Sequence, residues 1–425
     1  MSDQLRTSAD HSPVPGFRPR RRSVGAAALA LPGLLGLAAC GGSGDAASGD
    51  PGTVRVVDYY NTPADDTVIQ DTLEAVGTEV GVSISREKVP GDQLIQKVLQ
   101  MSSSKTLPDL LMLDNPDLQE IAKSGALAPL EDLGIDTSGF TQEILDAGTY
   151  EGKVYGLAPT VNTIALFCNT ALLKEAGVEA PTTWDELTET AAALTKDDTY
   201  GIAFSAIATY EGTWQFLPFM WSNGGDETDL ATEQVAGAGQ LWADLVAEGS
   251  ASKAVVNWGQ GDVIDQFKAG KAAMAVNGPW NISGLQSDAP DLEWEVVTIP
   301  VPTEGADSVA PLGGEVWTIP QTGDTEKQKK VAELLQKFVS PENQLAMGAA
   351  RSTIPASTEA AATFGKEHPE LATFVEQVST ARARTAKLGP EWPTTAKAIY
   401  TANQQILVDS VAPEQAFADA ADSLG

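Results

Sequence analysis

Residues 151–187 read EGKVYGLAPTVNTIALFCNTALLKEAGVEAPTTWDEL. The apolar run at 161–167 starts with β-branched residues and predicts a strand that is buried on both faces. Residues 169–176 predict a short helix that ends at the following glycine, which readily adopts the left-handed conformation found after helices. Thr183 and Glu186, three residues apart, predict a capping box that opens the next helix.

Two polar residues, Asn162 and Thr163, interrupt the predicted core strand. Because buried polar side chains need partners, this position favours either a satisfied strand end or a ligand site. The order of G-x-V-Y-G-L, a strand ending in Asn, L-L-K-x-A-G and P-x-T-W-D-E-L resembles the hinge segment of extracellular solute-binding proteins of ABC importers. The branch that it resembles is the sugar-binding, maltose-binding-protein-like one. In that family this strand crosses between two lobes, and the ligand lies in the cleft between them.

Residues 1–39 predict an export signal, with arginines before an apolar run that is shorter than the ~20 residues a membrane-spanning helix needs. The run ends in small residues before Cys40, which resembles a bacterial lipobox and implies lipid attachment at Cys40. An ordinary signal peptide with a chance cysteine is the alternative. The paired Arg21 and Arg22 allow twin-arginine export. Residues 40–52, rich in Gly, Ser, Ala and Asp, predict a flexible tether.

Composition narrows the class of function. Without residues 1–39 the chain has 386 residues, which is too long for one ordinary core and predicts two lobes. The formal net charge is −31 for the whole chain and becomes −34 without that segment, which carries five arginines and two aspartates. A surface this acidic repels nucleic acid and anionic lipid, so we expect no nucleic-acid partner.

Histidine and cysteine are too scarce for the usual catalytic and metal sites. After the signal the sequence has one histidine, His368, and Cys168 is the only cysteine besides Cys40. Hydrolases with a Ser or Cys nucleophile usually need a His base, and zinc sites need several N or S ligands. We therefore expect no catalytic residues, no metal and no cofactor, and we interpret Cys168 as a small buried hydrophobe. A glycosidase with two carboxylates stays open, because acidic residues are abundant.

Strands and helices alternate along the rest of the chain. The sequence therefore predicts an α/β, two-lobe periplasmic-binding-protein-like fold, in which each lobe is a largely parallel sheet flanked by helices. The expected domain ranges are 53–160 plus 300–341 for lobe I, and 161–299 plus 342–425 for lobe II. Three hinge crossings are expected, near 157–162, near 299–301 and at the start of a helix at Glu342.

Ligands of open α/β sheets bind outside the carboxyl ends of the strands. This rule selects Tyr59, Tyr60, Asn61, Asp114 and Asn115 as candidate binding residues. Each of them could equally serve as a capping or turn residue.

A second motif, AMAVNGPW at 273–280, is very similar to a strand and turn of the same family, whose tryptophan lines the sugar cleft. The resemblance implies cleft positions for Asn277 and Trp280, and for further aromatic rings at Trp214 and Trp392. Asn162 stands where maltose binders have a carboxylate, so the identity of the sugar stays open.

Three further candidates come from the return strand and a later helix. Gly314 and Glu315 begin a segment that resembles the family's return strand. Arg351 could serve a ligand carboxylate, lie beside a sugar hydroxyl group or form a surface salt bridge. Asp58, Asp114 and Glu315 at strand ends could instead serve a cation such as a polyamine.

The residue types suit a sugar. A pyranose has an apolar C–H face that stacks on aromatic rings, and a rim of hydroxyl groups that bonds to amides and carboxylates. We expect a monomer on the extracellular face of the membrane, lipid-anchored at Cys40, that captures a mono- or oligosaccharide and delivers it to an ABC permease. The alternatives are the same fold with a peptide or polyamine ligand, and a surface glycosidase.

Overall fold

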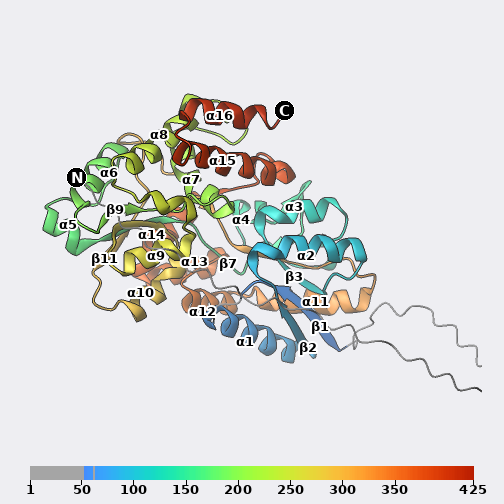
Figure 1. Cartoon of the computed structure of the whole chain (residues 1–425). Helices are drawn as coiled ribbons and strands as arrows, with labels where there is room; N and C mark the ends of the chain where they lie inside the picture. Colours follow the sequence, from blue (N-terminus) through green and yellow to red (C-terminus); the bar gives the residue numbers. More distant parts are fainter. Residues whose placement is uncertain (1–51, 61–62) are drawn as a thin grey trace, which may run out of the picture. The chain divides into compact units, whose positions relative to one another are not determined.

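The computed structural model describes residues 52–60 and 63–425, in which strands and helices alternate around two separate main sheets (Figure 1). The predicted signal, the proposed lipid-attachment residue Cys40, the tether up to residue 51 and the candidate Asn61 lie outside the described residues.

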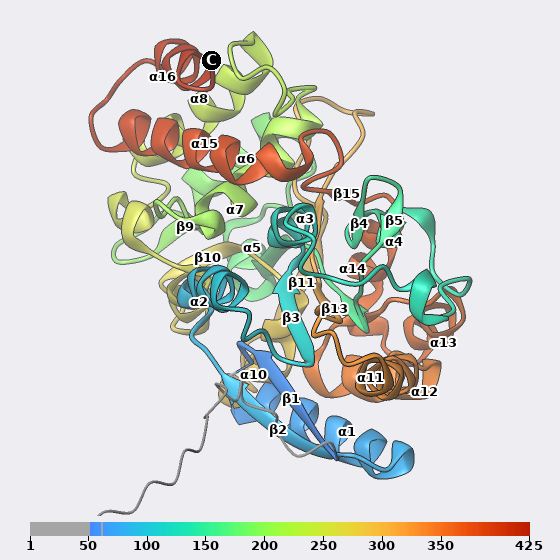
Figure 2. The same ribbon diagram turned by 90° about the vertical axis from the view of Figure 1, so that its right-hand side faces the viewer.

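Lobe I is built on a five-stranded sheet with the order β2-β1-β3-β13-β6. The strands are β1 (Thr53–Asp58), β2 (Ser83–Lys88), β3 (Leu110–Asp114), β6 (Gly156–Leu157) and β13 (Glu315–Thr318). Five helices of this lobe are α1 (Pro63–Val80), α2 (Gly91–Ser104), α3 (Asn115–Lys123), α11 (Thr325–Phe338) and α12 (Pro341–Arg351), of which α1, α11 and α12 pack against one another (Figure 2). Shorter elements are η1 (Glu131–Leu133), α4 (Gln142–Asp146), β4 (Thr149–Tyr150) and β5 (Lys153–Val154).

Lobe II is built on a four-stranded sheet with the order β11-β8-β10-β9. The strands are β8 (Ala165–Asn169), β9 (Tyr200–Ala203), β10 (Ala272–Asn277) and β11 (Trp294–Val297). The helices are α5 (Thr170–Ala176), α6 (Trp184–Leu194), α7 (Tyr210–Ser222), α8 (Glu233–Ala247), α9 (Gln260–Lys268), α10 (Ile282–Asp288), α14 (Ala372–Val378), α15 (Trp392–Leu407) and α16 (Pro413–Asp422). Short 3-10 helices are η2 (Lys253–Asn257), η3 (Pro279–Asn281), η4 (Pro369–Leu371) and η5 (Gly389–Glu391).

The sheets are largely parallel, as expected: all strands but one run in the same direction in each of them. In lobe I, β1 is parallel to β2 and β3, whereas β13 is antiparallel to β3 and β6. In lobe II, β10 is parallel to β9 but antiparallel to β8, and β11 is antiparallel to β8. The reversed strands β13 and β8 are those that enter from the other lobe. Each starts at the edge where its neighbour ends, as Glu315 opposite Asp114 and Ala165 opposite Asn277 show.

The first crossing lies where the sequence predicts it. The chain leaves β6 in lobe I, forms β7 (Thr160–Val161) and enters β8 in lobe II. Strand β14 (Ile354–Pro355) pairs with β7, so two segments that are far apart in sequence run side by side at the hinge.

The second crossing lies later than expected, at Gly313 rather than at 299–301. Val301 is still bound to lobe II, because its carbonyl oxygen accepts a hydrogen bond from the Trp184 backbone at 2.8 Å. Gly313 pairs with Asn162 through two backbone hydrogen bonds of 3.1 and 2.8 Å. The preceding β12 (Pro311–Leu312) pairs with β15 (Arg382–Ala383).

The third crossing also lies later, because α12 packs on α1 and therefore belongs with lobe I. Helix α13 (Thr358–Glu367) follows the same lobe, since the Thr358 backbone donates to the carbonyl oxygen of Gly139 at 3.1 Å. Helix α14 reaches lobe II, where the Gln377 amide donates to the Ile164 carbonyl oxygen at 3.3 Å. The chain thus crosses between α13 and α14, so the domain boundary expected at residue 342 is moved towards the C-terminus.

The cores explain part of the sequence pattern. Trp317 is fully buried in lobe I and packs edge-on against Phe338, and Trp242 is buried among three phenylalanine rings of lobe II. Cys168 is buried and free, and its burial raises the pKa of the thiol to about 12. The interpretation of Cys168 as a small buried side chain is confirmed.

Candidate functional site

One edge of the lobe I sheet brings together four of the predicted residues. Glu315 starts β13 opposite Asp114 at the end of β3, and Tyr59 and Tyr60 follow β1. The hydroxyl groups of Tyr59 and Tyr60 donate to the two carboxylate oxygens of Glu315 at 2.5 and 2.6 Å. Burial, followed by the charge of Glu315, raises the pKa of Tyr59 well above its ordinary value, so its hydroxyl group stays protonated at neutral pH.

Arg351, the last residue of α12, joins this edge from behind Tyr60. Its guanidinium carbon lies 4.3 Å from the centroid of the Tyr60 ring, and its Nε donates to Asp65 at 2.6 Å. Burial alone would lower the pKa of Arg351, but Tyr60, Glu315 and Asp65 raise it above the ordinary value. Arg351 is buried, so the alternative of a surface salt bridge does not describe it.

Arg384, which the sequence analysis misses, connects the two lobes. It follows β15, and its Nη2 donates to Asp114 Oδ1 at 2.6 Å and to Asn115 Oδ1 at 2.9 Å. Its guanidinium carbon also lies 4.7 Å from the centroid of the Trp214 ring in α7. The predicted residues Asp114 and Asn115 of lobe I and Trp214 of lobe II therefore meet at one arginine.

The segment around Arg384 is held by charges on both of its sides. Arg382 binds Asp226 and the buried Glu227, and Lys387 binds Asp226. Trp221 donates to Glu227 at 2.8 Å while the Arg382 guanidinium stacks on its ring at 4.6 Å. These contacts fix the backbone from which Arg384 reaches towards lobe I. A pair of arginines two residues apart in a very acidic chain is the sequence signal that could have pointed to this segment.

Asn162 and Trp214 lie against Gly313 at the hinge. A Cβ atom on Gly313 would lie 2.1 Å from Asn162 Oδ1 and 2.7 Å from Trp214 Cη2. Trp214 is buried, and in the described part of the chain no acceptor lies within hydrogen-bond distance of its indole nitrogen. The neighbouring Gly314 has φ of 132°, which favours glycine. Gly314 is therefore required for the backbone conformation of this crossing.

We expect Gly313→Ala to lower the free energy of unfolding by about 1–3 kcal/mol, because the new methyl group overlaps two packed side chains. Chemical denaturation measures this change. The control is Gly261→Ala in α9, where a Cβ would meet nothing within 4 Å. Equal unfolding midpoints for Gly313→Ala and the wild type would show that the hinge tolerates a side chain at this position.

Two predicted cleft residues have internal roles instead. Asn277 is fully buried, and its amide donates to the Gln260 carbonyl oxygen at 2.8 Å and accepts from Gly278 at 2.9 Å and Asn281 at 2.7 Å. These bonds occupy the Asn277 amide group within the protein and hold the turn after β10 in place. Trp392 is 1 % exposed and belongs to the lobe II core, so no face of its ring is available to a ligand. The ligand-binding roles expected for both residues are therefore corrected.

Trp280 is half-buried, as a cleft aromatic ring would be. Its ring folds back over Gly278, where a Cβ atom would lie 2.0 Å from Trp280 Cζ3. Gly278 of the NGPW turn thus makes room for the ring, which also packs against the edge of the lobe II core.

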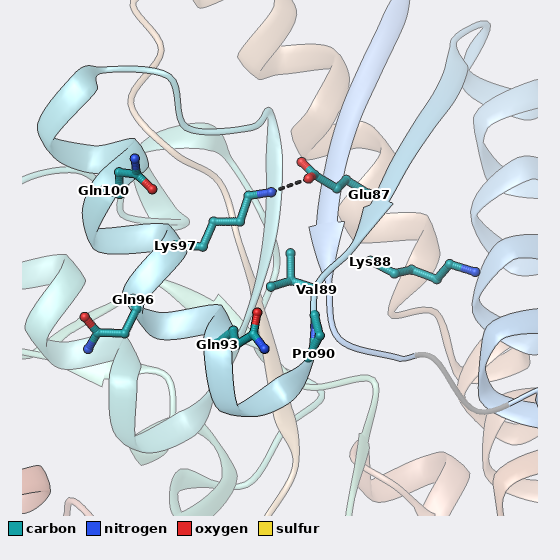
Figure 3. Close-up of a pocket in the computed structure, with 8 residues that line it drawn as sticks. All are labelled: Glu87, Lys88, Val89, Pro90, Gln93, Gln96, Lys97 and Gln100. Carbon is teal, nitrogen blue, oxygen red and sulfur yellow. Dashed lines mark hydrogen bonds and ion pairs between the residues drawn. The ribbon is translucent and has the colours of Figure 1, made fainter. Parts of the chain in front are cut away.

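A separate hollow of about 540 Å³ lies on the surface of lobe I between the end of β2 and α2 (Figure 3). It is lined by Glu87, Lys88, Val89, Pro90, Gln93, Gln96, Lys97 and Gln100. Lys97 and Glu87 form an ion pair across the hollow. Gly91, the first residue of α2, lies next to the Tyr59 ring, because a Cβ atom built on Gly91 would be 3.8 Å from that ring. The hollow is thus formed by the same β2–α2 connection that supports Tyr59.

Within 52–60 and 63–425, no three His, Cys, Asp or Glu side chains are grouped so that they could hold a metal ion. His368 caps α13 and pairs with Glu370 at 3.1 Å. The helices of these two ranges include none that is both long and apolar enough to cross a membrane.

Residues 71–373 match the family model of the bacterial extracellular solute-binding proteins. The chain belongs to this family. A putative binding protein of Brucella abortus (strain 2308) is 25% identical over 394 residues, which cover 88% of this chain and 93% of the relative. A maltooligosaccharide ABC transporter solute-binding lipoprotein of Streptococcus pneumoniae (strain R6) is 26% identical over 373 residues, which cover 82% and 83%.

The fold of this solute-binding protein is also that of solved structures. Maltose-bound MalE3 of T. maritima superposes with a TM-score of 0.79 at 20% identity, covering 88% of this chain and 98% of that one. The family and the two-lobe fold predicted from the hinge segment and the NGPW turn are therefore confirmed.

Proposed function

We propose that this solute-binding protein captures a mono- or oligosaccharide in the cleft between its lobes and presents it to an ABC permease. The observation that carries the proposal is the lobe I edge with Tyr59, Tyr60 and Glu315, which is joined to Trp214 of lobe II through Arg384. The sugar-binding names of curated relatives support the same ligand class.

The chemistry of this edge suits a polyol. Tyr59, Asp114, Asn162 and Glu315 are partly exposed and offer hydroxyl, carboxylate and amide groups, which can donate to or accept from sugar hydroxyl groups. Trp280 offers a half-exposed aromatic ring to the C–H face of a pyranose. The two arginines of this edge, Arg351 and Arg384, already pair with Asp65 and Asp114, which favours a ligand without a strong anionic group.

Capture would proceed by closure of the lobes about the three crossings. Arg384 and Asp114 come from different lobes, and so do Lys123 and Glu391, whose charged groups lie 4.0 Å apart. A ligand that contacts both lobes stabilises the closed state by its differential affinity for the two states. Lipid attachment at Cys40 would keep the monomer at the extracellular face of the membrane, beside its permease.

Thermal unfolding in the presence of sugars, peptides and polyamines tests the proposal. A tight ligand at about 100 times its dissociation constant should add roughly 2.7 kcal/mol to the free energy of unfolding. We expect a shift with sugars, and we expect the sugar to be recovered chemically unchanged after long incubation. An increase in the free energy of unfolding with peptides or polyamines alone would contradict the proposal that the ligand is a sugar. Recovery of a hydrolysed sugar would instead favour a glycosidase with two catalytic carboxylates.

A further inference from the structure

Asp117, in the first turn of α3, is a buried acid without a bonding partner. The residue is only 8% exposed to solvent. Within the part of the chain that the structure describes, no group donates a hydrogen bond to its carboxyl group and no cation pairs with it. Its carboxyl oxygens keep a small contact with solvent, because they are not among the fully enclosed atoms that lack a partner. Ionising a carboxyl group in such a largely buried site is costly without a partner.

The groups around Asp117 come from both lobes. Asp114 and Glu120 lie on its own side, whereas Arg384 and Tyr210 face it from lobe II. Burial raises the pKa of Asp117 to about 8, with Asp114 and Glu120 adding to the effect and Arg384 opposing it. Two carboxyl groups thus share one guanidinium group, and that group bonds to Asp114.

The remaining charges of the cleft are balanced. Arg351 pairs with Asp65, and Glu315 accepts hydrogen bonds from two tyrosine hydroxyl groups. Arg384 pairs with Asp114, so the carboxyl group of Asp117 is the one that the protein leaves without a counter-ion at this edge.

Two unused donors belong to Arg384, which acts on Asp117, and to Trp214, whose ring packs on Arg384. Arg384 Nε and Trp214 Nε1 are buried, and neither has a hydrogen-bond acceptor among the described residues. A bound group that offers both a cation to Asp117 and an oxygen acceptor to these donors would satisfy all three. A sugar that carries a basic amino group next to hydroxyl groups has this combination of atoms.

We propose that the cleft takes an amino sugar, with the ligand's ammonium group paired to Asp117 and a neighbouring oxygen facing Arg384 and Trp214. This inference rests on the proposed function and names the ligand class of the same site. It makes Asp117 a specificity-determining residue, because an ammonium group can form an ion pair with its carboxylate whereas a neutral sugar cannot.

Binding of an amino sugar should change the protonation of Asp117. In the free protein Asp117 holds a proton below pH about 8, whereas pairing with an ammonium group favours the carboxylate and lowers the pKa of Asp117. Binding an ammonium sugar at pH 7 therefore releases a proton from Asp117. The affinity should rise as the pH rises from 6 towards 8, for as long as the ligand amine stays protonated.

Calorimetric titration of the purified protein tests this. The probes are glucosamine, galactosamine and the β-1,4-linked glucosamine disaccharide, against glucose, galactose and cellobiose, each in two buffers of different ionisation enthalpy. We expect the amino sugars to bind at least tenfold more tightly than their neutral counterparts at pH 7, with release of close to one proton. Asp117→Asn should abolish both the preference for amino sugars and the proton release.

Glu131→Gln is the matched control, because it removes an exposed carboxylate of the same lobe that is not among the groups acting on Asp117, and it should leave the preference unchanged. Thermal unfolding of each variant shows that it is folded. Neutral sugars that bind as tightly as amino sugars, or a preference that survives in Asp117→Asn, would overturn the inference and leave the proposed function in place. Failure of every sugar to bind would overturn the proposed function and this inference with it.

Discussion

Arg86→Met is expected to lower the free energy of unfolding by about 3–5 kcal/mol, because it leaves a buried carboxylate without its counter-ion. Arg86 Nε and Nη2 donate to the two oxygens of Asp58 at 2.5 and 2.8 Å. The two side chains are 3% and 0% exposed, so water cannot replace the lost partner. Denaturation with urea, monitored by circular dichroism, measures the change.

The same substitution should weaken ligand binding, because the ion pair also holds the backbone from which the tyrosines project. Arg86 Nη2 donates to the Tyr60 carbonyl oxygen at 3.1 Å, and the Tyr60 backbone donates to Asp58 Oδ1 at 2.9 Å. Without the guanidinium group, Tyr60 loses one of these two restraints. The hydroxyl groups that bond to Glu315 would then be less well fixed.

Two further variants separate the causes. Lys97→Met removes a partly exposed cation that pairs with Glu87, and it should change the free energy of unfolding by no more than about 0.5 kcal/mol. Combining Asp58→Asn with Arg86→Met removes both charges and should recover part of the loss. An unfolding midpoint of Arg86→Met equal to that of the wild type would show that this pair does not stabilise lobe I.

The fold and one edge of the site are predictable because they depend on local patterns. Strand ends are visible in the sequence, and the rule for the carboxyl ends of strands correctly brings Tyr59, Tyr60 and Asp114 to one edge of the sheet. Glu315 joins them from the start of β13, an antiparallel strand that enters from the other lobe. The position of Glu315 therefore depends on where the chain crosses between the lobes.

Arg384 and Asp117 could not be predicted in the same way. Arg384 is not at the end of any strand that the rule selects, and its partners are 269 and 270 residues away. Asp117 follows Pro116 at a helix start, where an acid is usually an exposed residue that complements the helix dipole. Arg384 and Tyr210 of lobe II act on it, so its environment depends on tertiary structure.

Tryptophans are the hardest residues to assign from sequence, since a ring at a turn and a ring in a core have the same local pattern. Trp280 lies in the 3-10 turn η3 after Pro279, and Trp392 begins α15 before Pro393. Both therefore stand next to a proline at a helical start, and both carry the expectation of a cleft ring. The structure separates them by burial, because Trp392 is enclosed in the lobe II core and Trp280 keeps part of its surface exposed.

Opposite results are therefore expected for Trp280→Ala and Trp392→Ala. Trp280→Ala should weaken sugar binding by about 30–150-fold, the equivalent of about 2–3 kcal/mol for a lost stacking surface. It should lower the free energy of unfolding of the empty protein by at most about 1 kcal/mol, because the ring is half-exposed. Titration with the sugar found in the panel and urea denaturation measure the two quantities.

Trp392→Ala should lower the free energy of unfolding by about 3–5 kcal/mol, because it leaves a cavity in the lobe II core. Its sugar affinity, measured at a temperature where the variant is folded, should stay within about threefold of the wild type, since the ring touches no ligand. A stability loss in Trp280→Ala as large as that in Trp392→Ala would place Trp280 in the core as well. Tight sugar binding would then have to rest on Tyr59 and Trp214, which are the remaining aromatic rings at the junction of the lobes.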